Sequence, residues 1–366
     1  PLPEFKKFGV IIVLDNDDAG RNGSLKCAQK IYDELGIICE IAQWRDGLPS
    51  GYDISDDKDW KEFAFALDQR YEFRPKPSKD EPQRGVIEVM SIGQLLNADF
   101  QEPEIIVRNM LQQESVSVFG GCSGTGKSWA SLQIGMCIAS GLPVFGYFEV
   151  SKPHKVLLCQ FELTNGQVLT RTALLKKSFD KEWNTIDQNF DYQVMSKKLA
   201  FTDRWWTIDQ FLSDSDGRYS GGVVIVDNLY TSMDAGIDSS NNTQLIPVVK
   251  MMGDISEKHK VGLFVNTHHK KNTKMNPIDI DDILGGAVLS RYASNVFQMK
   301  QSKLSTDLRV AMITKVRGEA SELIEVPFKL RFNPDTGLFE KADVITNELL
   351  HYIEPKERWE IALAVE

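Results

Sequence analysis

The 366-residue chain lacks the long apolar runs that cross membranes and the basic excess that coats duplex DNA. No stretch approaches the roughly 20 apolar residues that span a bilayer, and no signal-peptide pattern is present. Lys and Arg number 42 against 52 Asp and Glu, which gives a formal net charge of −10. That balance argues against a broad basic surface but leaves room for a local basic loop. We expect no membrane segment and a cytoplasmic location.

Paired cysteines and an initiator methionine are also missing. The five cysteines are scattered without C-x-x-C pairs, so the sequence predicts neither a zinc site nor a disulfide framework. The chain begins at Pro1 and becomes β-like at residues 8–14. We therefore expect a fragment of a longer polypeptide, in a reducing compartment.

The length suits two domains, or one large domain with part of a second. Strand-like and helix-like runs alternate in residues 1–73, as in a piece of an α/β domain. Residues 74–85 are polar and rich in proline, which predicts a linker. Residues 86–342 form the main domain, and residues 343–366 are predicted to be a helical segment of unknown role.

Short, continuous, β-branched runs in the main domain, at 156–161, 223–226 and 261–265, predict central parallel strands. Residues 308–316 and 323–332, followed by a turn at 333–337, look like antiparallel strands at the sheet edge. The fold class predicted is therefore α/β, with a central parallel sheet.

The most informative run fits the phosphate-loop pattern G-x-x-x-x-G-K-[ST]. It follows a β-rich run at 115–119 and precedes an apolar helix at 129–140, which is the context that a phosphate-binding loop requires. Its backbone N–H groups would surround the phosphates, Lys127 would reach the β/γ oxygens, and Ser128 would coordinate Mg²⁺. The alternative is a glycine turn before a core helix. The predicted ATP-binding residues are Gly121, Cys122, Ser123, Gly124, Thr125, Gly126, Lys127 and Ser128.

Two acids extend this prediction. The strand 223–226 ends in Asp227, the Walker B pattern, which would hold Mg²⁺ through a water or through Ser128. Asn228 follows where many ATPases carry Glu, so the base that polarises water must come from elsewhere. Glu162, at the end of the strand after the phosphate-loop helix, is the candidate. The alternative is a surface acid that caps the next helix.

Several segments resemble replicative hexameric helicases with a RecA-type core. Residues 161–171 (FELTNGQVLTR) resemble that family's Glu-Met-Ser…Leu…Arg segment, which places its catalytic glutamate on Glu162. Residues 263–270 (LFVNTHHK) resemble its strand ending in a γ-phosphate sensor, which falls on His268. The double His is closer to plasmid RepA-type helicases than to the main bacterial replicative helicase. Residues 284–288 resemble the glycine-rich end of its DNA-binding loop. Asn295 departs from the family, where many members carry Asp.

The element Thr314-Lys315-Val316-Arg317-Gly318 resembles the family's Lys-x-Arg-x-Gly. The resemblance implies that Lys315 and Arg317 reach the γ-phosphate held by the adjacent subunit of a ring, a hexamer in that family. Two residues apart on a strand, they share one face. The alternatives are the solvated face of an edge strand for these two cations, and a locally satisfied strand end for His268 and His269.

The same resemblance places the loops 230–243 and 270–284 at a central pore. The second loop carries Lys270, Lys271 and Lys274, which can contact the phosphates of single-stranded DNA with an affinity that falls with salt. Acids at 279, 281 and 282 follow at once, and the first loop has no Lys or Arg.

Residues 13–23 (VLDNDDAGRNG) resemble the Asp-x-Asp-x-x-Gly-Arg element of TOPRIM domains in primases. Asp15 and Asp17 would then share a Mg²⁺, with Asp53 as one more acid. The alternative is an acidic turn in which Asp17 or Asp18 caps a helix. A complete centre needs a glutamate on a strand that would precede Pro1, so the chain should not prime on its own.

Together these features predict the ATP-dependent DNA helicase part of a primase-helicase replication protein, with a partial TOPRIM domain before a RecA-type core. One alternative is a RecA-like recombinase or helicase loader without unwinding. The other is an NTP-gated DNA-binding module with vestigial hydrolysis.

Overall fold

The computed structural model describes residues 9–35, 37–73, 90–193, 204–233, 242–270, 276–317, 322–343 and 347–353. The chain divides into two compact units, Pro1–Asp99 and Phe100–Glu366. The predicted linker at 74–85 lies outside the described residues. None of the helices in the described part of the chain has the length and apolar character needed to cross a bilayer.

The first unit is a small α/β structure. Its strands β1 (Ile11–Ile12), β2 (Glu40–Ile41) and β3 (Tyr71–Glu72) form a sheet in that order, with β1 and β2 parallel and β3 antiparallel. Helices α1 (Asp18–Leu35) and α2 (Lys61–Asp68) complete it, and α3 (Ile92–Leu96) follows. Helix α1 starts at Asp18, because the side chain of Asp17 caps it by accepting the Gly20 N–H at 2.7 Å.

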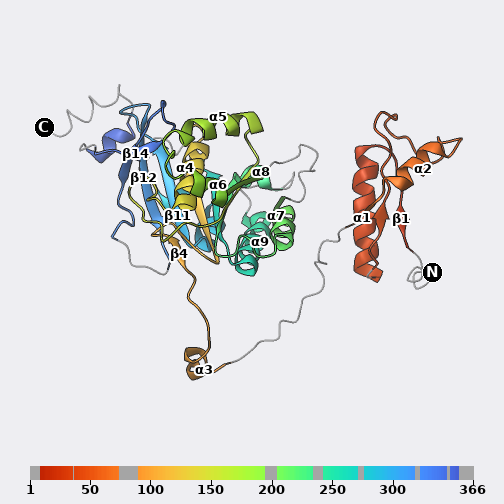
Figure 1. Ribbon diagram of the computed structural model, residues 1–366, viewed down its shortest axis with the longest axis horizontal. Helices are drawn as coiled ribbons and strands as arrows, with labels where there is room; N and C mark the ends of the chain where they lie inside the picture. Colours follow the sequence, from red (N-terminus) through yellow and green to blue (C-terminus); the bar gives the residue numbers. More distant parts are fainter. Residues whose placement is uncertain are drawn as a thin grey trace. The chain divides into compact units, whose positions relative to one another are not determined.

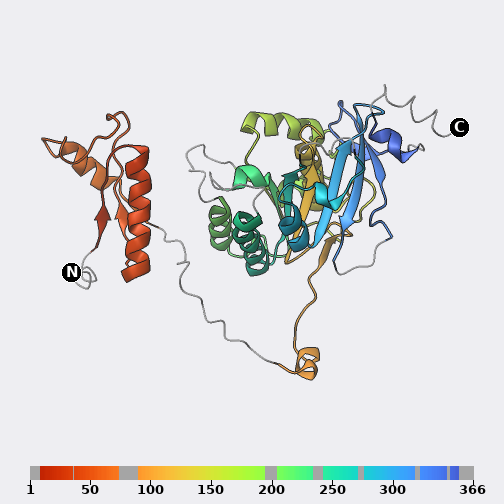
Figure 2. The ribbon, with the colours of Figure 1, turned by 180° about the vertical axis from the view of Figure 1, so that it is seen from behind.

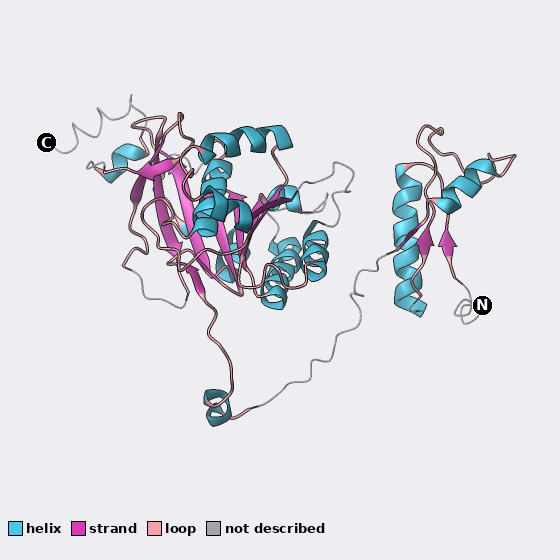
Figure 3. Cartoon of the chain, viewed as in Figure 1, coloured by secondary structure: helices cyan, strands magenta, loops and turns pink. Residues whose placement is uncertain are grey.

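Within the described residues, nine strands of the second unit form one sheet, in the order β14-β13-β12-β11-β6-β10-β9-β7-β8 (Figures 1 and 3). The strands from β11 to β8 in this order are parallel, and β12, β13 and β14 are antiparallel, as the sequence predicts. The bounds are β6 (Ser115–Gly121), β7 (Val156–Gln160), β8 (Phe190–Gln193), β9 (Val223–Asp227), β10 (Gly262–His268), β11 (Asn295–Gln301), β12 (Leu308–Lys315), β13 (Phe328–Phe332) and β14 (Phe339–Lys341), with β4 (Ile105–Val107) and β5 (Leu111–Gln112) paired separately.

Helices cover both faces of this sheet (Figures 1 and 2). The helices are α4 (Lys127–Ser140), α5 (Asn165–Lys176), α6 (Trp183–Asn189), α7 (Arg204–Asp214), α8 (Leu229–Ser232), α9 (Asn242–His259) and α10 (Gly286–Tyr292), with 3₁₀ turns η3 (Ile280–Asp282) and η4 (Glu348–His351). Within the predicted helical segment 343–366, the described residues hold only the short turn η4, and residues 344–346 and 354–366 lie outside the described part.

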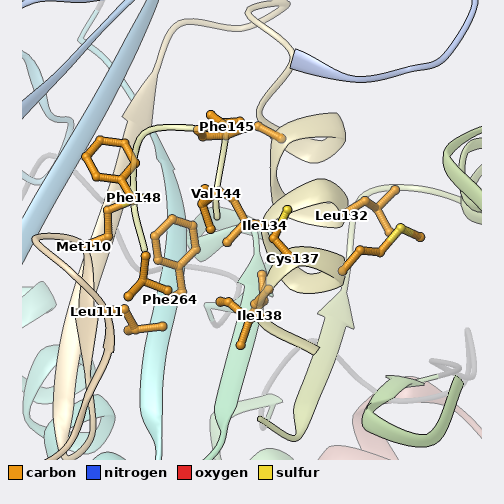
Figure 4. Close-up of a cluster of buried hydrophobic side chains, with 14 of the residues drawn as sticks. Met110, Leu111, Leu132, Ile134, Cys137, Ile138, Val144, Phe145, Phe148 and Phe264 are labelled. Atoms are coloured by element: carbon orange, nitrogen blue, oxygen red, sulfur yellow. The ribbon is translucent and has the colours of Figure 1, made fainter. Parts of the chain in front are cut away.

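The core explains these two layers. Side chains alternate along each central strand, so Phe119, Phe264 and Ile225 belong to one buried cluster while Val118, Val265 and Val226 belong to the other. The first cluster includes α4, whose apolar side chains face the sheet in Figure 4. Since α4 is buried along most of its length, the loop before it is held on a rigid element.

The hairpin β13–β14 closes the sheet beside α4. It turns at 333–337, where Gly337 has a φ of +74°. The predicted antiparallel strands 308–316 and 323–332 pair as β12 and β13, although β13 begins only at Phe328. Gln133 on α4 donates to the Phe339 carbonyl at 2.9 Å and accepts its N–H at 2.7 Å. The end of the sheet is therefore bonded to the phosphate-loop helix.

Candidate nucleotide-binding site

Four neighbouring parallel strands bring the predicted site residues to one edge of the sheet. The registers pair His268 with Gly121 and Gln160 with Asp227, so the phosphate loop and the three strand ends are level. Glu162 lies just after β7. The carboxyl edge of a parallel sheet is the usual position of a ligand site.

The phosphate loop runs from the end of β6 into α4 with two glycines in left-handed conformations, Gly124 at φ +81° and Gly126 at φ +96°. A Cβ on Gly126 would lie 2.7 Å from the ring of Phe339, so only glycine fits there. Ser123 and Gly124 are exposed, and Ser128 is half-buried in the first turn of α4. A helix N-terminus with free N–H groups is suited to phosphate.

Lys127 is buried in this loop. Its Nζ donates to the carbonyls of Gly121 at 2.7 Å and Cys122 at 3.1 Å. Burial lowers its pKa to about 8, against the raising effect of Asp227 and Glu162. The ammonium is thus held at the loop by neutral acceptors that a phosphate can replace.

Asp227 is buried and held by two amides. Its carboxylate accepts from Gln160 Nε2 on β7 and from Asn266 Nδ2 on β10, both at 2.7 Å. Asn266 also donates to Ser131 of α4 at 2.8 Å. The amides fix the carboxylate without neutralising it. Asp227 and the Ser128 hydroxyl are hard oxygen donors, which fit Mg²⁺.

Glu162 is exposed at the turn after β7. Its Oε2 accepts from Asn228 Nδ2 at 2.6 Å, and its N–H donates to Gln160 Oε1 at 2.8 Å. The alternative reading of Glu162 as the cap of α5 is wrong, because Thr164 and Gln167 form a complete capping box there.

His268 lies at the end of β10 beside the lysine. Its Nδ1 is 3.4 Å from Lys127 Nζ, and its ring packs on Tyr230 with centroids 5.3 Å apart. Burial and the Lys127 charge lower its pKa to about 4, so the ring is neutral near pH 7. His269 is buried next to Cys122, at 3.8 Å from Sγ, and its pKa falls to about 3.

A family model described as an AAA domain (AAA_25) matches residues 82–274, more than half of the chain. The chain belongs to this AAA domain family. No curated protein matches it in sequence.

Solved structures show the fold of the AAA domain. A DnaB-like replicative helicase, solved with its interactions with primase, is 11% identical at a TM-score of 0.50, over 69% of this chain and 67% of the other. A second solved structure, an isolated ATPase domain, is 11% identical at a TM-score of 0.49, over 63% and 86%. The RadB recombinase is 16% identical at 0.44, over 63% and 92%. The likeness to the DnaB-like helicase supports the fold class that the sequence predicts, an α/β domain with a central, mostly parallel sheet.

The two predicted cations beyond the family match, Lys315 and Arg317, lie away from the phosphate loop. Lys315 Nζ donates to the carbonyls of Ser290 and Arg291 at the end of α10, and Arg317 Nη2 also donates to Arg291. Burial and Arg317 lower the pKa of Lys315 to about 8. Lys315 pairs with Val296 on β11, and Val296 pairs with Val118 on β6, so the three residues are level in the sheet. Because β12 is antiparallel to β11, the chain after Lys315 runs away from the phosphate-loop edge.

Arg317 continues in that direction. It lines a cavity of about 610 Å³ together with Glu114 and Ser115, at the amino end of β6. The geometry therefore does not bring Arg317 to the phosphate loop of its own chain.

Of the predicted DNA-binding lysines of the AAA domain, only Lys270 is among the described residues; Lys271 and Lys274 lie outside them. Lys270 is exposed, and its N–H donates to the Asp282 carbonyl at 2.7 Å. The Asp282 side chain pairs with the buried Lys300 at 2.7 Å. The acid at 282 is thus a buried anchor of the loop.

In the first unit, Asp15 and Asp17 remain predicted metal ligands. No group of three or more His, Cys, Asp or Glu that could hold a metal occurs among the described residues. Asp17 caps α1, which was the alternative reading, and Arg21 pairs with Asp18 at 2.7 Å. A Cβ on Gly20 would lie 2.1 Å from the Asp15 carbonyl, so the glycine is needed for this turn.

Sequence reasoning missed the amide side chains that donate to the acids of the site, those of Gln160, Asn266 and Asn228. It also missed the place of Arg171, whose guanidinium lies over the Trp129 ring, 5.0 Å from its centroid. The sequence did offer a signal, since these amide residues stand at or near the ends of strands that carry the acids or lie beside them. Buried amides at strand ends can bond many other partners, however, so the pattern alone does not identify the site.

Proposed function

We propose that this AAA domain hydrolyses ATP between subunits of a ring and thereby moves on single-stranded DNA, as the helicase part of a primase-helicase replication protein. One observation carries the proposal. Lys127, Asp227, Glu162 and His268 meet at one sheet edge, while Arg317 lies towards the other. A site divided in this way is suited to completion by a second copy.

Each residue then has a role. Lys127 exchanges its carbonyl partners for the β/γ oxygens of ATP, and neutral His268 beside it senses the γ-phosphate. Ser128 and Asp227 would hold Mg²⁺, which when bound neutralises phosphate charge. The carboxylate of Glu162 orients a water and accepts its proton. The cavity of about 380 Å³ beside Ser123 and Thr125 has room for a nucleoside.

Lys315 and Arg317 of one subunit would complete the site of the next. Both side chains donate hydrogen bonds to backbone carbonyls. They can therefore exchange these partners for phosphate oxygens without breaking an ion pair. Lys270, with Lys271 and Lys274, would contact the DNA backbone, a contact that weakens as salt rises. Asp15 and Asp17 would be the remnant of a TOPRIM metal site.

The test is hydrolysis of ATP with Mg²⁺, with and without single-stranded DNA, by the wild type and by Glu162→Gln. We expect DNA to stimulate the wild type and the variant to be slower by about 100-fold or more. Equal hydrolysis rates for the wild type and Glu162→Gln would refute the proposed ATP-driven movement on DNA. DNA-stimulated hydrolysis without unwinding of a forked duplex would favour a recombinase-like or loader ATPase instead.

A further inference from the structure

We propose that Asn228 is a positioning residue that holds the carboxylate of Glu162 in its working place. The inference rests on the proposed function, since it concerns the same base. Asn228 stands directly after the Walker B strand, where many ATPases carry their own glutamate. Here the chain supplies an amide at this position and the acid from the neighbouring strand.

The two ends of the Asn228 amide have separate partners. Its Oδ1 accepts the N–H of Thr231 at 3.1 Å and so caps α8. Because that end must be the oxygen, the NH₂ group must be the end that faces Glu162, where it donates to Oε2 at 2.6 Å. Asn228 is 2% exposed, so its orientation is fixed by its surroundings.

In the described part of the chain, backbone hydrogen bonds and the packing of neighbouring residues also hold the turn that carries Glu162. Gln160 Oε1 accepts the N–H groups of Glu162 and Leu163, at 2.8 and 3.1 Å. Arg204 lies over the Phe161 ring, 4.7 Å from its centroid, and donates to the Thr231 carbonyl. Among the described residues, Asn228 alone donates a hydrogen bond to the Glu162 side chain itself.

The two functions of this side chain, capping α8 and donating to Glu162, explain why the residue is Asn. Aspartate and serine cap helices as well as asparagine does. Aspartate, however, would place a second carboxylate oxygen against Glu162, and serine is too short to reach it. Only the amide both caps α8 and donates to an acid.

Three variants separate the two roles. If Asn228 positions Glu162, Asn228→Ser and Asn228→Ala lower kcat about equally, by roughly 10-fold, and Asn228→Asp lowers it most, by roughly 100-fold. If only the cap matters, Asn228→Ala is the worst variant while Asn228→Ser and Asn228→Asp stay near the wild type. The KM for ATP should change by less than about twofold in Asn228→Ser, because ground-state binding does not use this contact.

A double-mutant cycle gives the second readout. In the Glu162→Gln background, Asn228→Ser should cause little further loss of kcat, because the carboxylate it served is gone. A further loss of about 10-fold there, or wild-type kcat in Asn228→Ser alone, would overturn the inference. Failure of the proposed function is seen separately, as wild-type hydrolysis no faster than that of Glu162→Gln.

Discussion

Lys300 and Asp282 form an ion pair of 2.7 Å with side chains only 1% and 8% exposed. Lys300 also donates to the carbonyls of residues 276 and 277, at 3.0 and 3.2 Å. One strand residue thus fixes both η3 and the chain that leads into it. A buried charge on β11 therefore anchors the described residues 276–282.

Removal of one partner should therefore be costly. Asp282→Ala leaves the Lys300 ammonium buried without its carboxylate, and we expect a loss of about 3 to 5 kcal/mol in the free energy of unfolding. Urea denaturation measures it. The matched control is Glu149→Ala, which breaks the exposed pair with Arg108, 3.9 Å apart, and should cost less than about 1 kcal/mol. Equal losses for the two would contradict the assignment.

Gly126 should tolerate no side chain. Gly126→Ala adds a strained φ and a contact of 2.7 Å with Phe339, whereas Gly146→Ala, at φ +71° with open space, adds strain alone. We expect Gly146→Ala to cost about 1 to 2 kcal/mol of unfolding free energy and Gly126→Ala to cost about 1 to 3 kcal/mol more. Thermal or urea unfolding compares them, and the same loss for both would disprove the ring contact.

Acid should destabilise the domain through His268. Its folded pKa of about 4 lies below the unfolded value of about 6.5, so the unfolded chain binds more protons between these values. The free energy of unfolding then falls as pH drops from about 6.5 to 4 and is unaffected by this group above that window. His268→Gln should flatten the slope by up to about 1.4 kcal/mol per pH unit. Parallel wild-type and variant curves would show that the group is not buried neutral.

A shared active site predicts complementation between inactive subunits. Arg317→Ala keeps its phosphate loop, and Lys127→Ala keeps its Arg317, so each should be inactive alone. Mixed in equal amounts, they should regain roughly a quarter of the wild-type ATPase rate, because that share of random interfaces joins an intact loop to an intact arginine. No recovery, although mixed oligomers form, would contradict a site shared between Lys127 of one subunit and Arg317 of another.

The sequence predicted the second unit well because its signals are local. Runs of β-branched residues gave β7, β9 and β10, and the spacing of glycines, Lys127 and Ser128 gave the loop between β6 and α4. The antiparallel edge followed from the turn at 333–337. These features depend on neighbouring residues, which a single chain displays directly.

The polar network around Asp227 was beyond that reasoning. Gln160 and Asn266 lie far from Asp227 along the chain, and only the register of three strands makes them its neighbours. The cap of α1 by Asp17 was foreseen only as an alternative, since the sequence does not display the close approach of Gly20 to the Asp15 carbonyl on which this turn depends. Strand register and backbone contacts between distant residues cannot be predicted from local composition.

The bond between Gln133 and Phe339 extends the folding unit beyond the family match, which ends at residue 274. A fragment cut there would leave β6 without β11 on one side, and an unpaired strand edge invites aggregation. It would also lose the ring that covers Gly126. Any expressed version of this domain must therefore reach at least residue 341 to keep its phosphate loop in shape.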